Sequence, residues 1–205
     1  MKVIIPMGGF GTRLRPHTWS RPKQLISMAG KPVLAHVMDT FTTLPEPEEL
    51  EYVFIVGKLG EQIRAYMNTY YPKLQVTYVV QEEMRGQSHA ISLAREYLQG
   101  PMLMVFADTL VETDLSFLAH ETAGGVAWVK QVPDPRRFGV AEVDSRGNVT
   151  RLIEKPNEMN NNLAVVGCYY FKQGAKLLQA IQEQFRLNIS LKNEFYLVDA
   201  INLFL

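Results

Sequence analysis

Four short apolar runs alternate with helix-length segments over the first half of the chain, and this alternation limits the fold more than any other feature. The runs are rich in Val, Ile and Phe, as buried strands are. They cover Val3–Met7, Tyr52–Val56, Val76–Val80 and Met102–Ala107. Helical patterns of crossover length lie between them, at Pro32–Leu44, Glu61–Tyr71 and Ser88–Leu98. The sequence therefore predicts an α/β fold of Rossmann-like type, with a mostly parallel, twisted sheet and helices on both faces.

The pattern changes after residue 125. Alternating or aromatic strands are predicted at Val126–Val132, Phe138–Val143, Val149–Ile153 and Val165–Phe171. The turn residues Asp144–Gly147 indicate a hairpin between two of them. Helices are predicted again at Gly174–Phe185 and Phe195–Leu205. We expect one domain over residues 1–205 with a mixed sheet, in which residues 126–205 form a substrate-binding layer beside residues 1–125.

The charge balance excludes a general polyanion binder. Lys plus Arg and Asp plus Glu number 21 each, so no net positive field holds nucleic acid. A small anionic ligand in a local basic pocket fits better. No apolar run approaches the roughly 20 residues that span a bilayer, so we expect no membrane partner.

Cysteine content and the chain ends give weaker indications. Cys168 is the only cysteine, which excludes an intrachain disulfide framework and favours a reducing compartment, so we expect a cytoplasmic protein. The apolar start at Val3–Met7 is too short for a signal peptide core. The helical pattern of Asp199–Leu205 stops without a cap, so we expect a C-terminal segment to be missing. The sequence does not determine whether the protein forms a homo-oligomer.

A glycine-rich, basic stretch follows the first predicted strand directly, in Gly8-Gly-Phe-Gly-Thr-Arg-Leu-Arg-Pro16. Glycines at this position let backbone N–H groups approach a phosphate, although such glycines are also common in ordinary tight turns. Neither GxGxxG nor the P-loop spacing is present. The basic residues that follow favour a phosphate loop; they are Arg13, Arg15, Arg21 and Lys23.

GGFGTRLRP followed by RPKQL resembles the signature of sugar-phosphate nucleotidylyltransferases, also called nucleoside-diphosphate-sugar pyrophosphorylases. These enzymes join a nucleoside triphosphate to a sugar 1-phosphate and release pyrophosphate. The resemblance implies that the nucleotide is lined by Gly8, Gly9, Gly11 and Thr12. It also implies that Arg13 and Lys23 contact the phosphates and act in catalysis. Met7 stands where Ala is common in the family.

The segment Gln81-Glu-Glu-Met-Arg-Gly-Gln-Ser-His-Ala90 is similar to the family's base-recognition segment. Gln81 offers both a donor and an acceptor to a pyrimidine edge. Gly86 permits close approach of the base or ribose. Gln87 and Ser88 replace the usual Thr and Ala, and a polar loop with a helix cap at Ser88 is the alternative interpretation.

Two carboxylates are candidates for a metal. Asp108 follows the strand Met102–Ala107, where it reaches the carboxyl edge of the sheet or caps a turn. Phe106–Thr109 resembles the family's Gly-Asp-Asn or Gly-Asp-Thr site, and Glu194–Ala200 resembles its Glu-x-x-x-Thr-Asp ending. The resemblance implies that Asp108 and Asp199 hold Mg²⁺, a hard cation that prefers oxygen ligands. The alternative is that Asp199 only begins a helix or faces out from it and binds no metal.

Three further segments resemble the elements that bind the sugar phosphate in this family: Phe138–Glu142, Glu154-Lys-Pro156 and Val166–Phe171. The resemblance implies that the sugar phosphate is bound by Gly139, Glu154, Lys155 and Gly167. By spacing alone, Glu154-Lys-Pro156 is an ordinary strand exit. Cys168 is interpreted as a buried packing residue.

These motifs predict a magnesium-dependent nucleotidylyltransferase whose substrates are a nucleoside triphosphate, held by residues 1–125, and a sugar 1-phosphate, held by residues 126–205. Gln81 favours UTP or dTTP, and glucose 1-phosphate is the favoured acceptor. A non-catalytic regulatory subunit that binds a nucleotide sugar, or a guanylyl-, adenylyl- or cytidylyltransferase, is the alternative. The missing GxGxxG argues against a nicotinamide-dependent oxidoreductase. The histidines, which include His89, are too scattered for a zinc site and receive no role.

Overall fold

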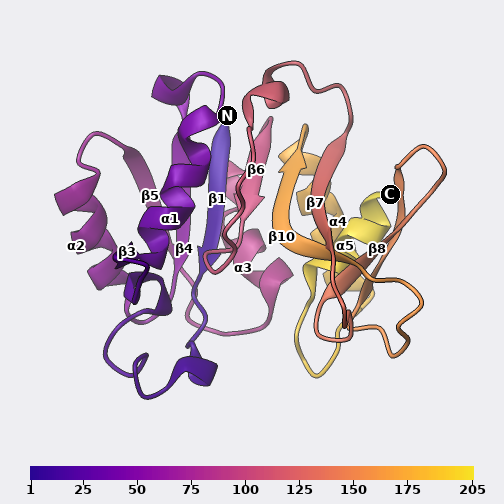
Figure 1. Cartoon of the computed structure of the whole chain (residues 1–205), viewed down its shortest axis with the longest axis horizontal. Helices are drawn as coiled ribbons and strands as arrows, with labels where there is room; N and C mark the ends of the chain where they lie inside the picture. Colours follow the sequence, from indigo (N-terminus) through magenta and orange to yellow (C-terminus); the bar gives the residue numbers. More distant parts are fainter.

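A mixed sheet of eight strands forms the centre of the computed structural model, which describes residues 1–205. Seven strands follow the order β5-β4-β1-β6-β10-β8-β9, and β7 pairs with β10 (Figure 1). The strands are β1 (Lys2–Met7), β4 (Glu51–Val56), β5 (Gln75–Val80), β6 (Met102–Val105), β7 (Gly125–Gln131), β8 (Gly139–Val143), β9 (Val149–Glu154) and β10 (Leu163–Phe171). A separate small hairpin consists of β2 (Ser27–Met28) and β3 (Lys31–Pro32).

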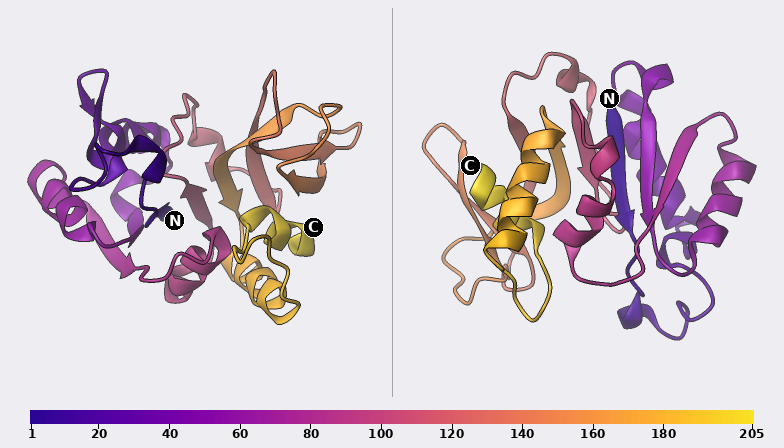
Figure 2. Two further views of the ribbon diagram at one scale, coloured as in Figure 1. Left: turned by 90° about the horizontal axis from the view of Figure 1, so that it is seen from below. Right: turned by 180° about the vertical axis from the view of Figure 1, so that it is seen from behind.

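Five helices complete the fold and cover both faces of the sheet (Figures 1 and 2). They are α1 (Val33–Thr40), α2 (Gly60–Tyr70), α3 (Gln87–Leu93), α4 (Gly174–Arg186) and α5 (Leu197–Phe204). The longest, α4, has 13 residues, and none is both long and apolar enough to cross a membrane.

The strands of the first half are parallel, and β1, β4 and β6 are buried on both faces, whereas the edge strand β5 is not. Strand β1 lies between β4 and β6, with parallel register on each side. Ile4 and Ile5 are fully buried in two different apolar clusters because successive side chains of a strand point to opposite faces. Ile5 shares its cluster with residues of α1 and α2, whereas Ile4 shares its cluster with residues of α3, α4 and α5. The predicted α/β sheet with helices on both faces is thereby confirmed.

The strands of the second half are antiparallel, so the sheet is mixed. Strand β10 runs antiparallel to β6, β7 and β8. Strands β8 and β9 form the predicted hairpin, in which the Oδ1 atom of Asp144 accepts hydrogen bonds from the backbone N–H groups of Arg146 and Asn148. The parallel arrangement is limited to β5, β4, β1 and β6.

Three predicted helices are shorter than expected. Helix α1 ends at Thr40 and α3 at Leu93, and each is followed by a short 3-10 turn. Helix α5 begins at Leu197, because the backbone of Phe195 makes hydrogen bonds with Arg85 and Ser88 and Tyr196 is extended. Contacts distant in sequence therefore replace the helical hydrogen bonds that local propensity favours.

Ile4→Ala and Ile5→Ala are each expected to lower the free energy of unfolding by about 2–5 kcal/mol, because each removes a fully buried side chain and leaves a cavity. Urea unfolding followed by circular dichroism measures the change. Gln75→Ala, at an exposed position of β5, is the control, with an expected change within about 0.5 kcal/mol. If either isoleucine variant matched this control, the two-faced burial of β1 would be contradicted.

Candidate functional site

Close backbone approach shapes the loop after β1. A Cβ atom added to Gly57 would lie 2.4 Å from the carbonyl oxygen of Gly8, so the β4–α2 turn and the loop touch through backbone atoms. Gly11 has a φ of +59°, which favours glycine. Its carbonyl accepts a hydrogen bond of 2.8 Å from the Thr18 hydroxyl. The geometry of the loop therefore favours glycine at Gly11 and Gly57, whereas a Cβ atom at Gly9 would meet nothing within 4 Å.

A cavity of about 390 Å³, here called the loop cavity, lies at the carboxyl ends of β1, β5 and β6. Ligands of open α/β sheets bind at this edge. The cavity collects most of the residues predicted to contact a nucleotide or its phosphates. Those present in its lining are Gly8, Gly9, Thr12, Lys23, Gln81, Gly86 and Asp108. Gly11 and Arg13, which were predicted with them, lie outside this lining.

A second cavity of about 570 Å³, here called the sheet cavity, lies over β8, β10 and the end of β9. Its lining includes the predicted residues Arg13, Asp108, Gly139, Glu154 and Gly167. Asp108, Phe106 and Gln87 line both cavities. The two groups of residues predicted from separate motifs therefore meet at Asp108.

Asp108 is held at this meeting point by the end of β6. The backbone N–H of Phe106 donates to the carbonyl of Gly167 at 2.9 Å, and the Thr109 hydroxyl donates to the carbonyl of Val166 at 2.8 Å. The ammonium group of Lys23 donates to the carboxylate of Asp108 at 2.5 Å. The Asp108 side chain is 59% exposed, so the carboxylate remains open to a ligand.

Gln81 forms a nearly buried part of the loop cavity and is 5% exposed. Its Nε2 atom lies 3.4 Å from Nδ1 of His89. Its Oε1 atom lies over Gly8, where an added Cβ would be 2.6 Å away. The Gln81 amide is therefore fixed between a helix residue and the glycine loop.

Backbone hydrogen bonds join the segment after β5 to the segment before α5. The N–H of Phe195 donates to the carbonyl of Arg85 at 2.9 Å, and the N–H of Ser88 donates to the carbonyl of Phe195 at 3.0 Å. Gly86 has a φ of +98°, and a Cβ there would lie 2.5 Å from backbone atoms of Phe195. These bonds fix the start of α5, which carries Asp199.

Three carboxylates influence one another beside the sheet cavity. Burial raises the pKa of Glu154; Lys155 lowers this pKa, and Asp199 and Glu194 raise it. Burial also raises the pKa of Asp199. Asp199 is therefore close to Glu154, although it does not itself line the cavity. No cluster of three or more His, Cys, Asp or Glu side chains is arranged to hold a metal.

The Lys155 ammonium points to Tyr196, whose hydroxyl accepts its hydrogen bond at 2.9 Å, and lies 3.5 Å from a carboxylate oxygen of Glu154. Lys155 is absent from the lining of the sheet cavity. Lys130 and Arg137 line it instead and form none of the chain's ion pairs. The basic pair Arg136-Arg137, which directly precedes the sugar-side motif at Phe138, is the sequence feature that could have indicated Arg137.

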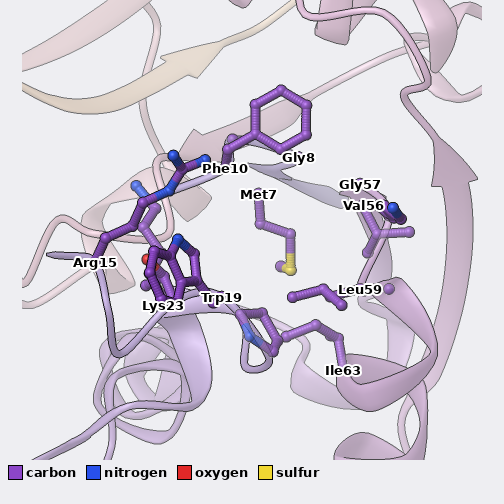
Figure 3. A pocket seen from close by; sticks show the side chains of 15 residues that line it. Met7, Gly8, Phe10, Arg15, Trp19, Lys23, Val56, Gly57, Leu59 and Ile63 are labelled. Carbon is purple, nitrogen blue, oxygen red and sulfur yellow. The ribbon is translucent and has the colours of Figure 1, made fainter. Parts of the chain in front are cut away.

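A third cavity, of about 310 Å³, lies on the other side of the glycine loop, against the β4–α2 turn (Figure 3). In Figure 3, Arg15, Trp19 and Lys23 lie on one side of the Met7 side chain, and Val56 and Gly57 lie on the other. Lys23 lines this cavity as well as the loop cavity. The glycine loop therefore separates this third cavity from the loop cavity and lines both of them.

The fold and the position of these cavities define an α/β protein with a ligand site at the carboxyl edge of its parallel strands. The model of the family described as nucleotidyl transferase matches residues 2–197. The chain belongs to this family. The match covers the loop and sugar-side motifs and Asp108 but ends before Asp199, and the family predicted from the motifs is confirmed.

The similar proteins agree with this assignment. The low-salt glycan biosynthesis nucleotidyltransferase Agl11 of Haloferax volcanii is 35% identical over 98% of this chain and 56% of its own length. The UTP–glucose-1-phosphate uridylyltransferase AglF of the same organism is 30% identical over 83% of this chain and 72% of its own. A solved structure of a putative glucose-1-phosphate thymidylyltransferase from Bacillus anthracis is 25% identical, with a TM-score of 0.83 over 100% of this chain and 82% of its own. The chain spans about half the length of the curated relatives it matches, from 39% to 72%.

Asp199→Asn is expected to raise the melting temperature at neutral pH in the absence of metal. Burial raises the folded-state pKa of Asp199, so the folded protein binds more protons than the unfolded chain, and stability falls as pH rises through this pKa. Asparagine does not ionise, so the variant avoids the cost of the buried negative charge. Its higher melting temperature relative to the wild type should disappear below the unfolded-state pKa of about 3.9, where Asp199 is protonated in both states. Thermal unfolding of both proteins from about pH 3 to 7.5 measures this difference in melting temperature.

The matched control is Asp114→Asn. Hydrogen bonds from Ser116 lower the pKa of Asp114, so its loss should not stabilise the protein at neutral pH. A lower melting temperature for Asp199→Asn at neutral pH would mean that the Asp199 carboxylate stabilises the fold.

Proposed function

We propose that the protein transfers a nucleoside monophosphate from a nucleoside triphosphate to a sugar 1-phosphate and releases pyrophosphate. The observation that carries this proposal is the position of Asp108, which lines both the loop cavity and the sheet cavity. A reaction between two substrates needs one point at which both reach the reacting phosphorus. Membership of the nucleotidyl transferase family supports it.

The loop cavity is proposed to bind the nucleotide. Its walls are backbone at Gly8 and Gly9, which leaves room for phosphates to approach N–H groups. Gln81 offers its amide to the base, and Gly86 lines the same cavity. These residues all belong to residues 1–125, which are the proposed nucleotide-binding part.

The sheet cavity is proposed to bind the sugar phosphate. Most of its lining comes from residues 126–205, the proposed sugar-binding part. Glu154 can accept hydrogen bonds from sugar hydroxyls, and Gly139 and Gly167 line the cavity beside it. Arg13, Lys130 and Arg137 supply positive charge for the phosphate.

Electrostatics supplies most of the catalysis in this proposal. In-line attack of a sugar phosphate oxygen on the α-phosphorus brings two polyanions together, and pyrophosphate leaves on the opposite side. Lys23 and Arg13 are proposed to neutralise the charge that spreads over the phosphoryl oxygens in the transition state. No covalent nucleophile is required, and Cys168 is fully buried.

The donor set fits Mg²⁺, which is usually bound by one or two carboxylates together with substrate phosphates and water. Asp108 is an exposed carboxylate between the two cavities, and Asp199 is a half-buried carboxylate whose pKa is raised by burial. We propose that these two residues hold the ion. When bound, Mg²⁺ would neutralise phosphate charge and help to orient the phosphates.

UTP or dTTP is the proposed donor and glucose 1-phosphate the proposed acceptor. The Gln81 amide matches the donor and acceptor groups of a uracil or thymine edge. The relative AglF, which is 30% identical, is a UTP–glucose-1-phosphate uridylyltransferase by name and so has the same base and sugar.

Purified protein with Mg²⁺ is expected to release pyrophosphate only when a triphosphate and a sugar 1-phosphate are both present. A panel of nucleoside triphosphates and sugar 1-phosphates, read by a coupled pyrophosphate assay, identifies the pair. Asp108→Asn should lower kcat by about 10²–10³-fold, because it removes charge from the reacting centre. Asp114→Asn, outside all of the cavities described above, is the control and should keep wild-type activity.

Absence of turnover with every pair would contradict the proposal. If nucleotide-sugar binding were intact in that case, and also in Asp108→Asn, a regulatory role would be favoured instead. Equal loss of activity in Asp108→Asn and Asp114→Asn would place the effect on folding rather than on the reaction.

A further inference from the structure

The amide of Gln81 has two orientations that differ in what they offer a base. Gln81 is 5% exposed, and its side chain makes one hydrogen bond, in which its Nε2 atom lies 3.4 Å from Nδ1 of His89. Its Oε1 atom lies beside Gly8, in the wall of the loop cavity. Turning the amide by 180° would exchange donor and acceptor at the cavity.

His89 can donate or accept at Nδ1 according to its tautomer, and the tautomer with its proton on Nε2 favours the amide orientation of this structure. A neutral imidazole has one donor and one acceptor nitrogen, and an Nδ1 atom that faces an amide nitrogen must be the acceptor. Burial lowers the pKa of His89, Arg85 lowers it further, and Glu83 opposes this. The neutral ring with its proton on Nε2 therefore keeps an acceptor for the N–H of Gln81 and leaves the Gln81 oxygen for the cavity.

We propose that His89 is a positioning residue that fixes the Gln81 amide and thereby makes the site select uracil or thymine over cytosine. Uracil and thymine donate from N3–H and accept at O4, so they match an amide whose oxygen is fixed toward the base. Cytosine accepts at N3 and donates from its amino group, so it matches the turned amide. The inference rests on the proposed function, in which the loop cavity binds the nucleotide.

The surrounding structure holds His89 in place. It lies in the first turn of α3, directly after Ser88, which is fully buried. The Ser88 hydroxyl donates to the carbonyl of Tyr196 at 3.2 Å, and the Ser88 N–H donates to the carbonyl of Phe195. These bonds hold the backbone at the start of α3 and thereby keep His89 beside Gln81.

The test is the ratio of kcat/KM for UTP or dTTP, whichever is better, to that for CTP, with the same sugar phosphate and Mg²⁺. His89→Leu removes the acceptor and is expected to lower this ratio by about tenfold, the effect of one net hydrogen bond. His89→Asp provides only acceptors and is expected to keep a ratio near that of the wild type. His120→Leu, at an exposed position outside the cavities, is the matched control and should change nothing.

Equilibrium binding of UTP and CTP is measured by calorimetry on the same proteins, so base preference is read independently of turnover. His89→Phe, which also lacks an acceptor, replaces the leucine variant if that variant does not fold. An unchanged ratio in the leucine or phenylalanine variant, an equal fall in His89→Asp, or a wild-type preference for CTP would overturn the inference. A wild-type protein without turnover that still prefers UTP by His89-dependent binding would contradict the proposed reaction but support the role of His89.

Discussion

The antiparallel pairing of β10 with β6 is the contact on which the rest of the site depends. It joins the parallel half of the sheet to the antiparallel half, with Cys168 opposite Val105. Gly167, at a φ of +79°, comes so close that an added Cβ would lie 2.6 Å from the Phe106 ring. Residues of both halves therefore surround the end of β6, and Asp108 is placed where the loop cavity and the sheet cavity meet.

Charge is distributed around this point in a way that suits two phosphorylated substrates. Cations come from the glycine loop and from the antiparallel half, and Lys23 already pairs with Asp108. Glu154 and Asp199 are carboxylates whose pKa values are raised by burial, a cost to stability that a bound cation or a sugar would offset. The backbone bonds between Phe195 and the segment after β5 keep Asp199 and Gln81 in one rigid arrangement.

Sequence patterns predicted the parts of the molecule that are local. Apolar runs identified the strands, and the glycines after Met7 identified the loop, because backbone geometry and burial leave a direct mark on residue type. Contacts distant in sequence were not predictable. The start of α5 at Leu197, the turn of Lys155 toward Tyr196 and the contact of His89 with Gln81 all depend on tertiary packing. Lys130 reaches the site because its strand β7 pairs with β10, and Arg137 because it lies just before β8, which also pairs with β10.

A crystal structure of the protein with UDP-glucose and Mg²⁺ tests the central claim most directly. The account predicts the uracil in the loop cavity beside Gln81, the glucose in the sheet cavity beside Glu154, and the diphosphate between them at Asp108. Binding of the whole nucleotide sugar within one cavity, or a diphosphate distant from Asp108, would contradict it.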